Sequence, residues 1–414
     1  MKISMISEHA SPLATPGSVD AGGQNVHVAA LSRALARRGH AVTVYTRRDD
    51  EALPERVQLD AGVEVVHVPA GPAARIPKDD LLPYMPELAA GVAADWAANG
   101  PPDVVHGHFW MSGLAAADAA RASSSPPAVL QTFHALGTVK RRHQGAADTS
   151  PPQRAWLEPR VGREVDMVVA TCADEVDELA AMGVRRDRVR IAPCGVDLDE
   201  FTLDGPVDRR GAALRILSIG RLVPRKDVEL VIRAMTLLPK RGVTDVELVV
   251  VGASGAGVTP DPEVERLRKV ASQLGVADRV RFRGQVPRED VPSLLRSADV
   301  VACTPWYEPF GIVPLESMAC GAPVVAARVG GLADTVVDGS TGLLVRPRDE
   351  RALADGLVKL LTDAALRASM SRAGRARVET RYTWDRVAAT TEQIYAETMA
   401  LASQRSQQLA GAAS

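Results

Sequence analysis

Residues 299–325 read DVVACTPWYEPFGIVPLESMACGAPVV, and this stretch decides the class of fold. The run DVVACTP, at 299–305, and the run APVVAAR, at 322–328, are apolar with little alternation. Such runs are typical of parallel strands that are covered on both faces. Residues 313–320 between them have a helical pattern. The stretch therefore predicts a strand, a helix and a second strand of a parallel sheet.

The same alternation of strands and helices runs along most of the chain. It breaks at 197–213, DLDEFTLDGPVDRRGAA, which is polar, contains Gly and Pro, and lacks periodicity. We predict an α/β fold of two Rossmann-like doubly wound domains, residues 1–200 and 201–384, facing each other across a cleft. An amphipathic helix is expected at 385–403. Before the break, strands are expected in KISMIS, AVTVYTR, VEVVHVP, DVVHGHF, AVLQTFHA, MVVATC and VRIAPCG, with helices at 24–38 and 86–98; after it, strands are expected in LRILSIG, VELVVVG, VRFRGQV, DVVACTP, APVVAAR and TGLLV, with helices at 226–238, 262–274, 289–297 and 313–320.

Composition excludes several classes of function. A chain of 414 residues suggests two domains, and a formal net charge of −2 argues against a general nucleic-acid surface. Neither a signal peptide nor an apolar run of roughly 18 residues stands out, so we expect a cytoplasmic protein without an integral membrane segment. The four cysteines form no C-x-x-C pair, which favours reduced thiols over disulfides or a zinc site; they are Cys172, Cys194, Cys303 and Cys320.

Two carboxylates follow one predicted strand, Glu308 in the loop after it and Glu316 in the first turns of the next helix. In open parallel sheets, ligands bind beyond the carboxyl ends of the strands. Gly311 would let the loop fold back, so that the amides of Phe310, Gly311 and Ile312 point toward a ligand. Acceptors for hydroxyl groups beside amides for an anion predict a sugar-nucleotide site.

Two cations follow another predicted strand, LRILSIG. Arg221 and Lys226 lie at its junction with a helix, where they would bind a diphosphate. A solvated basic loop is the alternative for this segment. Arg225 lies between the two and is a candidate for the solvated side chain.

In the first predicted domain, glycines and histidines stand at strand ends. Gly22 and Gly23 open a helix after the loop 8–21, where backbone can approach an anion. The pattern is not G-x-G-x-x-G, which lowers the case for a nicotinamide cofactor. His106 and His108 alternate along a strand and so share a face, and His134 ends the next strand.

Two short patterns could in principle bind a metal. His106-x-His108 has such spacing, but no third ligand stands nearby in sequence, so a polar lining is favoured. Asp197-x-Asp199 resembles a metal–nucleotide pair, but it lies in the segment between the domains, where a helix cap or linker is favoured.

With these residues placed, the chain resembles retaining glycosyltransferases of the GT-B family 4 over nearly its whole length. The segments that carry the resemblance are GGQNVHVAALSRALARRGHAVTVYT, DVVHGHFWMSG, PCGVDLDEF, SIGRLVPRKD, EPFGIVPLESMACGAPVV and GGLADTVVDGSTGLLVRPRD. The resemblance implies a hexosyltransferase type of enzyme with a nucleotide sugar as substrate, no cofactor and no required metal. It also implies that the C-terminal helix packs back on the first domain.

The resemblance assigns roles on the donor side. Arg221 and Lys226 would bind the diphosphate, Glu316 the ribose hydroxyls, and Glu308 the hydroxyls of the transferred sugar. His134 would contact that sugar and, through its carbonyl, stabilise charge at the anomeric carbon. The other donor-binding residues implied are Gly22, Gly23, Arg283, Gly284, Phe310, Gly311, Ile312 and Val313, with Arg283 and Gly284 beside the nucleobase.

GGQNVHV and HFWMSG are most similar to the branch that holds the glycosyltransferase of mycothiol synthesis and the sucrose-phosphate synthases. The resemblance then implies that Asn25, Lys78, His108 and Phe109 face the acceptor. The mycothiol enzyme usually has Tyr at the position of Phe109 and Thr at that of Ala135. Because both hydroxyls are absent here, we expect a small polar acceptor other than an inositol phosphate, in small-thiol, cyclitol or specialised metabolism.

The remaining expectations concern the reaction and its alternatives. The donor is expected to be a UDP- or GDP-sugar, and a homodimer is compatible with the sequence. Retention would arise by same-face attack, in which the departing phosphate takes the acceptor proton. A nucleotide-sugar epimerase, a pseudo-glycosyltransferase that couples non-sugar rings, and a non-catalytic regulatory subunit remain as alternatives.

Overall fold

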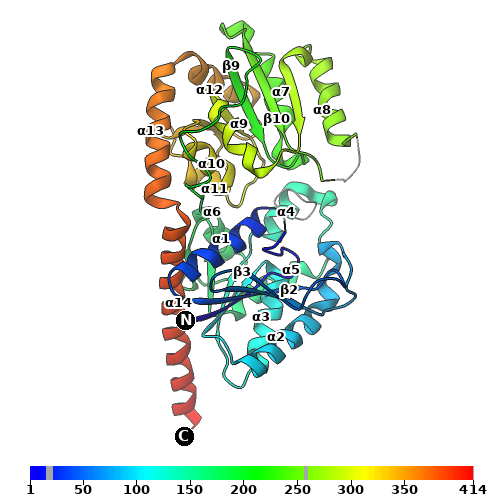
Figure 1. Cartoon of the computed structure of the whole chain (residues 1–414), viewed down its shortest axis with the longest axis vertical. Coiled ribbons are helices and arrows are strands. Elements are labelled where there is room, and N and C mark those ends of the chain that lie inside the picture. The colour runs from blue at the N-terminus through cyan, green and yellow to red at the C-terminus, as the bar shows by residue number, and fades with distance from the viewer. Residues whose placement is uncertain (15–21, 256–259, 414) are drawn as a thin grey trace. The chain divides into compact units, whose positions relative to one another are not determined.

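The protein is described by a computed structural model that covers residues 1–14, 22–255 and 260–413, with backbone alone for 405–413. The chain divides into two compact units. The first unit comprises Met1–Pro16, Asp20–Pro193 and Trp384–Ser414, and the second comprises chiefly Cys194–Thr383. Each unit contains one sheet that is wholly or almost wholly parallel, with helices on both faces (Figure 1). The predicted pair of Rossmann-like doubly wound domains is confirmed.

The sheet of the first unit has the strand order β3-β4-β2-β1-β5-β6-β7-β8. All neighbours are parallel except β3, which is antiparallel to β4 at the edge. The sequence did not predict β3, because its alternating, mostly exposed residues form no apolar run. The strands are β1 (Lys2–Ile6), β2 (Ala41–Arg47), β3 (Arg56–Asp60), β4 (Val63–Val68), β5 (Val104–His108), β6 (Ala128–Thr132), β7 (Met167–Ala170) and β8 (Val189–Ile191).

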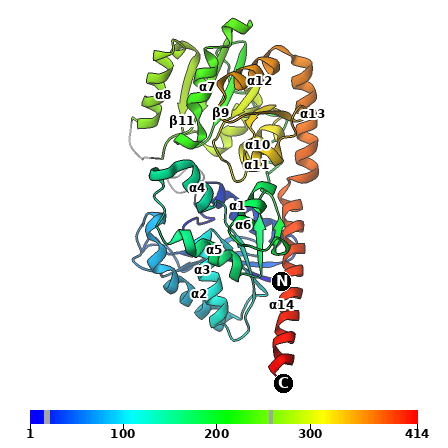
Figure 2. The same ribbon diagram turned by 180° about the vertical axis from the view of Figure 1, so that it is seen from behind.

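Helices cover both faces of this sheet (Figure 2). One face packs on α1 (Gly23–Arg37) and α14 (Trp384–Ala413); the other packs on α2 (Met85–Asn99), α3 (Trp110–Ala122), α5 (Arg154–Glu164) and α6 (Ala173–Ala181). Helix α1 buries Val28, Leu31 and Leu35 at helical spacing. The first unit also contains α4 (Gly137–Gln144) and a 3-10 turn, η1 (Lys78–Asp80).

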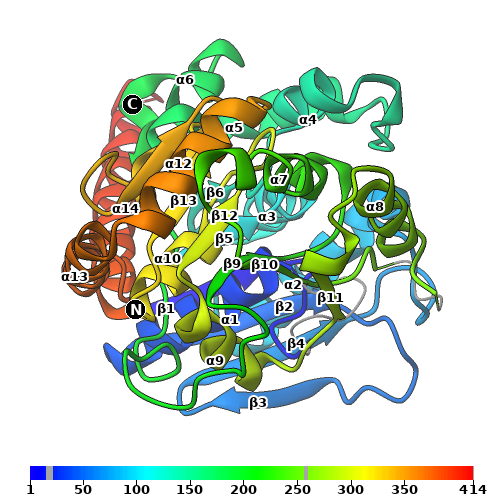
Figure 3. The ribbon, with the colours of Figure 1, turned by 90° about the horizontal axis from the view of Figure 1, so that it is seen from above.

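The sheet of the second unit has the strand order β11-β10-β9-β12-β13-β14, and all its neighbours are parallel. Figure 3 shows β9 and β12 side by side at its centre. The order reverses at that pair, and such a switch point is where open α/β sheets bind ligands. The strands are β9 (Leu214–Ile219), β10 (Val246–Val251), β11 (Val280–Gly284), β12 (Val300–Cys303), β13 (Val324–Ala327) and β14 (Gly342–Val345).

Seven helices of the described residues cover this second sheet. One face packs on α7 (Val228–Met235), α8 (Pro262–Gln273) and α12 (Glu350–Thr362), the other on α9 (Val291–Ser297), α10 (Ile312–Ala319) and α11 (Gly330–Thr335), while α13 (Ala364–Arg381) contributes to both cores. Helix α7 begins later than the predicted 226–238, because Lys226 belongs to the 3-10 turn η5 (Pro224–Lys226).

The boundary between the units differs from the predicted 200/201. The second unit already begins at Cys194 and runs to Thr383. The N–H of Val196 donates to the carbonyl oxygen of Tyr382 over 2.8 Å, and Phe201 is fully buried in the second core. The polar segment 197–213, which was predicted to separate the domains, is therefore anchored in the second unit at its start.

The C-terminal helix α14 is longer than the predicted 385–403. It begins at Trp384 and ends at Ala413. Its N-terminal half inserts apolar side chains into the first unit's core, among them Val387, Ile394 and Tyr395. The last helix of the chain therefore packs against α1, the first.

Two further sequence expectations concern thiols and membranes. All four cysteines are free thiols. Within the described ranges, no helix combines the length and the apolar character that a membrane span requires.

Candidate active site

Lys226 and Glu308 meet at the carboxyl ends of the neighbouring strands β9 and β12. The ammonium of Lys226 donates to Oε2 of Glu308. Arg225 Nη1 lies 3.4 Å from the same oxygen and donates to the carbonyl oxygen of Tyr307 over 3.3 Å. Arg225 is therefore not the solvated side chain that the sequence allowed. The structure brings together the predicted diphosphate cation and the predicted sugar-binding carboxylate.

The charges of this cluster shift each other's pKa. Burial alone would raise the pKa of Glu308, but Lys226 and Arg225 outweigh it and lower that pKa. Burial, joined by the charge of Arg225, lowers the pKa of Lys226, although Glu308 opposes the shift. Glu308 is therefore ionised at neutral pH, where a carboxylate accepts hydrogen bonds from hydroxyl groups.

Gly311 shapes the loop between the two carboxylates. Its φ of +81° lies in the left-handed region, and it caps the N-terminus of α10. Two glycines at the start of α11 pack against this loop. A Cβ on Gly330 would lie 2.3 Å from the carbonyl oxygen of Glu308, and the N–H of Gly331 donates to that oxygen over 2.8 Å. Sequence reasoning gave these glycines no role, although it quoted the segment that contains them.

The amides of Ile312 and Val313 lie in the first turn of α10, where N–H groups have no partner within the helix. Phe310 and Ile312 are half-buried in this loop. The predicted set of amides is thus gathered at one helix start. Such a helix start favours an anion.

Glu316 is buried on α10 and paired with a residue that the sequence did not single out. Arg288, at the start of the 3-10 turn η8 (Arg288–Asp290), donates to Glu316 Oε1 over 2.7 Å and to Glu200 Oε1 over 2.6 Å. Burial raises the pKa of Glu316, although Arg288 opposes the shift. Arg288 follows β11, so the rule that ligands bind beyond strand ends could have found it.

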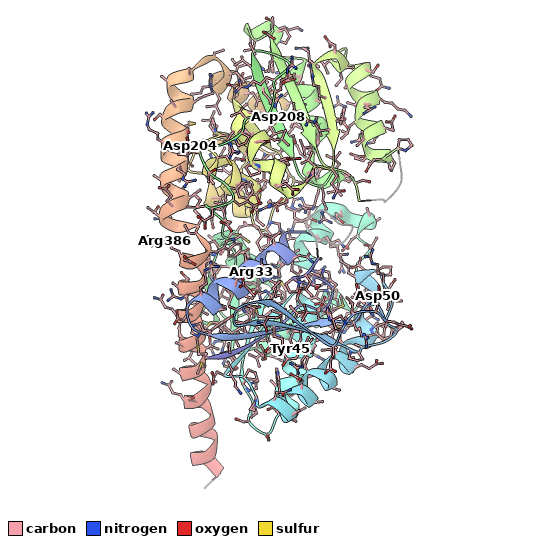
Figure 4. All side chains as sticks on the ribbon, in the orientation of Figure 1. Arg33, Tyr45, Asp50, Asp204, Asp208 and Arg386 are labelled. Carbon is pink, nitrogen blue, oxygen red and sulfur yellow. The ribbon has the colours of Figure 1, made fainter. Side chains whose placement is uncertain are left out.

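Three other predicted donor residues lie on β11 or just after β9. Arg221 follows β9 and is exposed. Arg283, on β11, forms an ion pair of 3.2 Å with Asp208, which also pairs with buried Arg215 over 2.7 Å (Asp208 is labelled in Figure 4). Gly284 has a φ of +68°, and its carbonyl oxygen accepts from the N–H of Gly252 over 2.8 Å. Arg283 therefore has a carboxylate partner that the sequence did not predict.

A cluster of buried histidines occupies the strand ends of the first unit. Nδ1 of His108 lies 2.9 Å from Nε2 of His134, and the rings of His106 and His108 are 4.2 Å apart at their centroids. His106 also lies 2.8 Å from the hydroxyl of Tyr395 on α14. His27 of α1 packs beside His134, with 5.2 Å between centroids. The predicted shared face of His106 and His108 is confirmed.

Burial lowers the pKa of every histidine in this cluster. The pKa falls to about 4 for His27 and to about 3 for His106, and it falls well below 6.5 for His108 and His134. The rings are neutral at pH 7, which suits a polar lining. His134 has a positive φ of 62°, which turns its backbone at the strand end.

The metal alternatives find no support in the part of the chain that the structure describes. There, no group of three or more His, Cys, Asp or Glu side chains could hold a metal ion. Asp197 instead uses Oδ1 to accept from the N–H groups of Asp199 and Glu200, over 2.9 and 3.3 Å. These bonds close a turn, because no helix begins at Asp197, so of the two favoured interpretations the structure agrees with a linker.

Phe109 lies at the start of α3 with a φ of +87° and is buried. The guanidinium carbon of Arg154 lies 5.0 Å from its ring centroid. Arg154 is itself buried, donates to the carbonyl oxygen of Ala135 over 2.5 Å, and is paired with Glu158 over 2.7 and 3.0 Å. Phe109 and Ala135 are the two positions that lack the hydroxyls of the mycothiol enzyme. Both therefore contact Arg154, whose charge is paired with Glu158.

Gly22, Gly23 and Asn25 form the start of α1. Oδ1 of Asn25 accepts from the N–H of Gly22, and Nδ2 donates to the carbonyl oxygen of Ser11, each over 3.0 Å. These bonds give Asn25 a structural role beside the predicted one. Residues 15–21 of the predicted loop 8–21 lie outside the described residues. Lys78 is partly exposed in η1 and donates to Asp79 over 3.1 Å.

Comparison with known proteins identifies the family of the chain. Residues 21–200 match the family described as Glycosyltransferase Family 4, and residues 206–377 match Glycosyl transferases group 1. A protein of Xylanimonas cellulosilytica named D-inositol 3-phosphate glycosyltransferase is 39% identical over 96% of both chains. One of the same name from Streptomyces avermitilis is 36% identical over 96% of this chain and 88% of its own. The solved sucrose-phosphate synthase from Thermosynechococcus elongatus superimposes with a TM-score of 0.86 at 31% identity, over 97% of this chain and 99% of that one.

Proposed function

Because this chain belongs to the family 4 glycosyltransferases, we propose that it transfers a hexosyl group from a UDP- or GDP-sugar to a small polar acceptor, with retention of the anomeric configuration. One observation carries the donor assignment. Lys226 and Glu308 meet at the switch point of the second sheet, between β9 and β12. A cation for phosphate beside an acceptor for sugar hydroxyls matches the diphosphate of a nucleotide sugar and the sugar attached to it.

The cations are proposed to stabilise the negative charge that develops on the leaving diphosphate. As the bond between the anomeric carbon and the phosphate oxygen breaks, negative charge grows on the β-phosphate. Lys226 and Arg221 stabilise that charge in place of a divalent ion. Arg225 lies beside Glu308 and, after Lys226, is the second cation that lowers its pKa.

Retention follows from same-face attack. The acceptor hydroxyl oxygen forms its bond to the anomeric carbon on the face from which the diphosphate departs, and the departing phosphate oxygen takes the hydroxyl proton. Glu308 is engaged by two cations, which weakens it as a nucleophile for double displacement. It acts as the acceptor of hydrogen bonds from the sugar, and Glu316 does the same for the ribose.

The acceptor is proposed to be a small polyol without a phosphate group. The named relatives act, by their names, on D-inositol 3-phosphate. In this chain Arg154 is covered by the Phe109 ring and neutralised by Glu158, so its charge is already matched. A phosphate would also lack hydroxyl donors at positions 109 and 135.

Two assays test the proposal. In a thermal-shift panel with UDP-, GDP-, ADP- and TDP-glucose, one of the four should raise the melting temperature of the protein most. A ligand that binds only the folded state stabilises that state against unfolding. Turnover with that donor should then be higher with myo-inositol than with D-inositol 3-phosphate, and the product should keep the anomeric configuration. An epimerised donor without acceptor, or turnover with non-sugar rings alone, would replace the proposal with one of the alternatives.

A further inference from the structure

Two loops meet at the Lys226–Glu308 pair, and hydrogen bonds other than the one within that pair hold the loops together. The first loop contains η5 and Asp227, and the second runs from Thr304 to Glu308. The N–H of Trp306 donates to the carbonyl oxygen of Arg225 over 2.8 Å. The hydroxyl of Thr304 donates to the carbonyl oxygen of Asp227 over 3.1 Å. The backbones of the two loops are thus held side by side.

Asp227 adds a side-chain bond to this link at a backbone position that suits glycine. Its φ of +50° and ψ of +44° lie in the left-handed region, which Gly adopts most readily and Asp or Asn only occasionally. Its Oδ2 accepts from Nε1 of Trp306 over 3.0 Å. Strain of this kind persists only where surrounding contacts compensate for it. The compensating contact here joins the residue after Lys226 to a residue just before Glu308.

The indole of Trp306 is held on a second side as well. The guanidinium carbon of Arg348 lies 4.2 Å from the Trp306 ring centroid. Arg348 also has a positive φ, of 58°. Two strained residues that are not glycine therefore converge on one indole. Burial raises the pKa of Asp227, while the Trp306 bond opposes that shift and favours the carboxylate.

From these contacts we infer that Asp227 and Trp306 form a positioning pair that sets the spacing between Lys226 and Glu308. The inference rests on the proposed function, since it takes Lys226 as the phosphate ligand and Glu308 as the sugar ligand. Donor turnover needs both at one spacing, whereas a nucleoside diphosphate without sugar needs only the cation. The pair therefore acts on the placement of the sugar and leaves diphosphate affinity unchanged.

Three variants separate the parts of this pair. Asp227→Gly removes the acceptor and relieves the backbone, and Asp227→Asn keeps an acceptor oxygen and tolerates the left-handed region. Trp306→Phe removes the donor and keeps a smaller aromatic ring beside Arg348. Asp227→Gly and Trp306→Phe should each lower kcat about tenfold, the effect of one lost hydrogen bond. Asp227→Asn should recover most of what Asp227→Gly loses. The double variant Asp227→Gly/Trp306→Phe should be no slower than either single variant, because both remove the same bond.

The measurements are kcat and KM for the sugar nucleotide that the thermal-shift panel identifies, and the affinity for its nucleoside diphosphate. Diphosphate affinity should stay within about twofold of the unchanged protein, a result that a general loss of structure would not give. Trp156→Phe, at an exposed tryptophan of α5, is the matched control. The inference would be overturned if the losses of kcat in the two single variants multiplied in the double variant. It would also be overturned if Asp227→Gly left kcat unchanged, or if diphosphate affinity fell as much as kcat. Failure of the proposed function is seen separately, as undiminished turnover in Lys226→Ala.

Discussion

Arg288 Nη1 donates to Glu316 Oε1 over 2.7 Å, and the same guanidinium binds Glu200. A buried carboxylate that lost this partner would favour its neutral form. Burial raises the pKa of Glu316, and Arg288 opposes that shift at the carboxylate that we assign to the ribose of the donor. The pair joins residues that lie on opposite sides of β12 in sequence.

The first prediction concerns this carboxylate. Glu316→Ala should raise the donor KM about tenfold and leave the acceptor KM nearly unchanged, because the lost hydrogen bonds belong to the nucleotide. Steady-state kinetics with each substrate varied in turn measures the two constants. Glu289→Ala, at an exposed carboxylate next to Arg288, is the control. Equal rises in both constants would argue against a ribose contact.

A second prediction concerns Lys226. Lys226→Ala should lower kcat by about a hundredfold or more, because it removes stabilisation of the leaving diphosphate and leaves Glu308 with Arg225 alone. Circular dichroism should show an intact fold. The matched control is Lys240→Ala, which changes an exposed lysine of the same unit. Near-normal turnover in the first variant would remove Lys226 from the mechanism.

The histidine cluster predicts a loss of stability in mild acid. The pKa of His27 is lowered from 6.5 to about 4, so the unfolded chain binds more protons than the folded one between those values. Stability from this group is complete above 6.5 and is lost as the pH falls toward 4, by on the order of 3 kcal/mol. Thermal unfolding across this range should show the decline.

His27→Gln isolates the contribution of that ring. The variant should be less stable at neutral pH, because a polar amide replaces a packed imidazole, but its stability should fall less steeply with acid. A slope that matches the unchanged protein would show that His27 is not protonated on unfolding in this range.

A fourth prediction concerns metals. Turnover should survive treatment with EDTA, because Arg221 and Lys226 take the part of a divalent ion in the proposed mechanism. The assay compares treated and untreated protein, each with and without added Mg²⁺ or Mn²⁺. Activity that disappears with EDTA and returns with either ion would revive Asp197 and Asp199 as ligands.

Much of the site could be predicted because strand ends are visible in the sequence. Apolar runs locate β9 and β12, and the rule that ligands bind beyond the carboxyl ends then selects Lys226 and Glu308. The rule could place Arg288 near the site, because it follows β11, but it does not show that Arg288 pairs with Glu316. It says nothing about Asp227, which the sequence places only inside a predicted helix.

By itself, the sequence determined the two α/β units, because the spacing of apolar residues sets which segments become strands and which become helices. Only the tertiary structure decided which polar groups pair. His106 meets Tyr395 over 2.8 Å across 289 residues, and Trp306 meets Asp227 across 79. Such pairings depend on strand order and on where α14 packs. Local periodicity does not encode these, since hydrogen bonds form between whichever groups the completed core brings together.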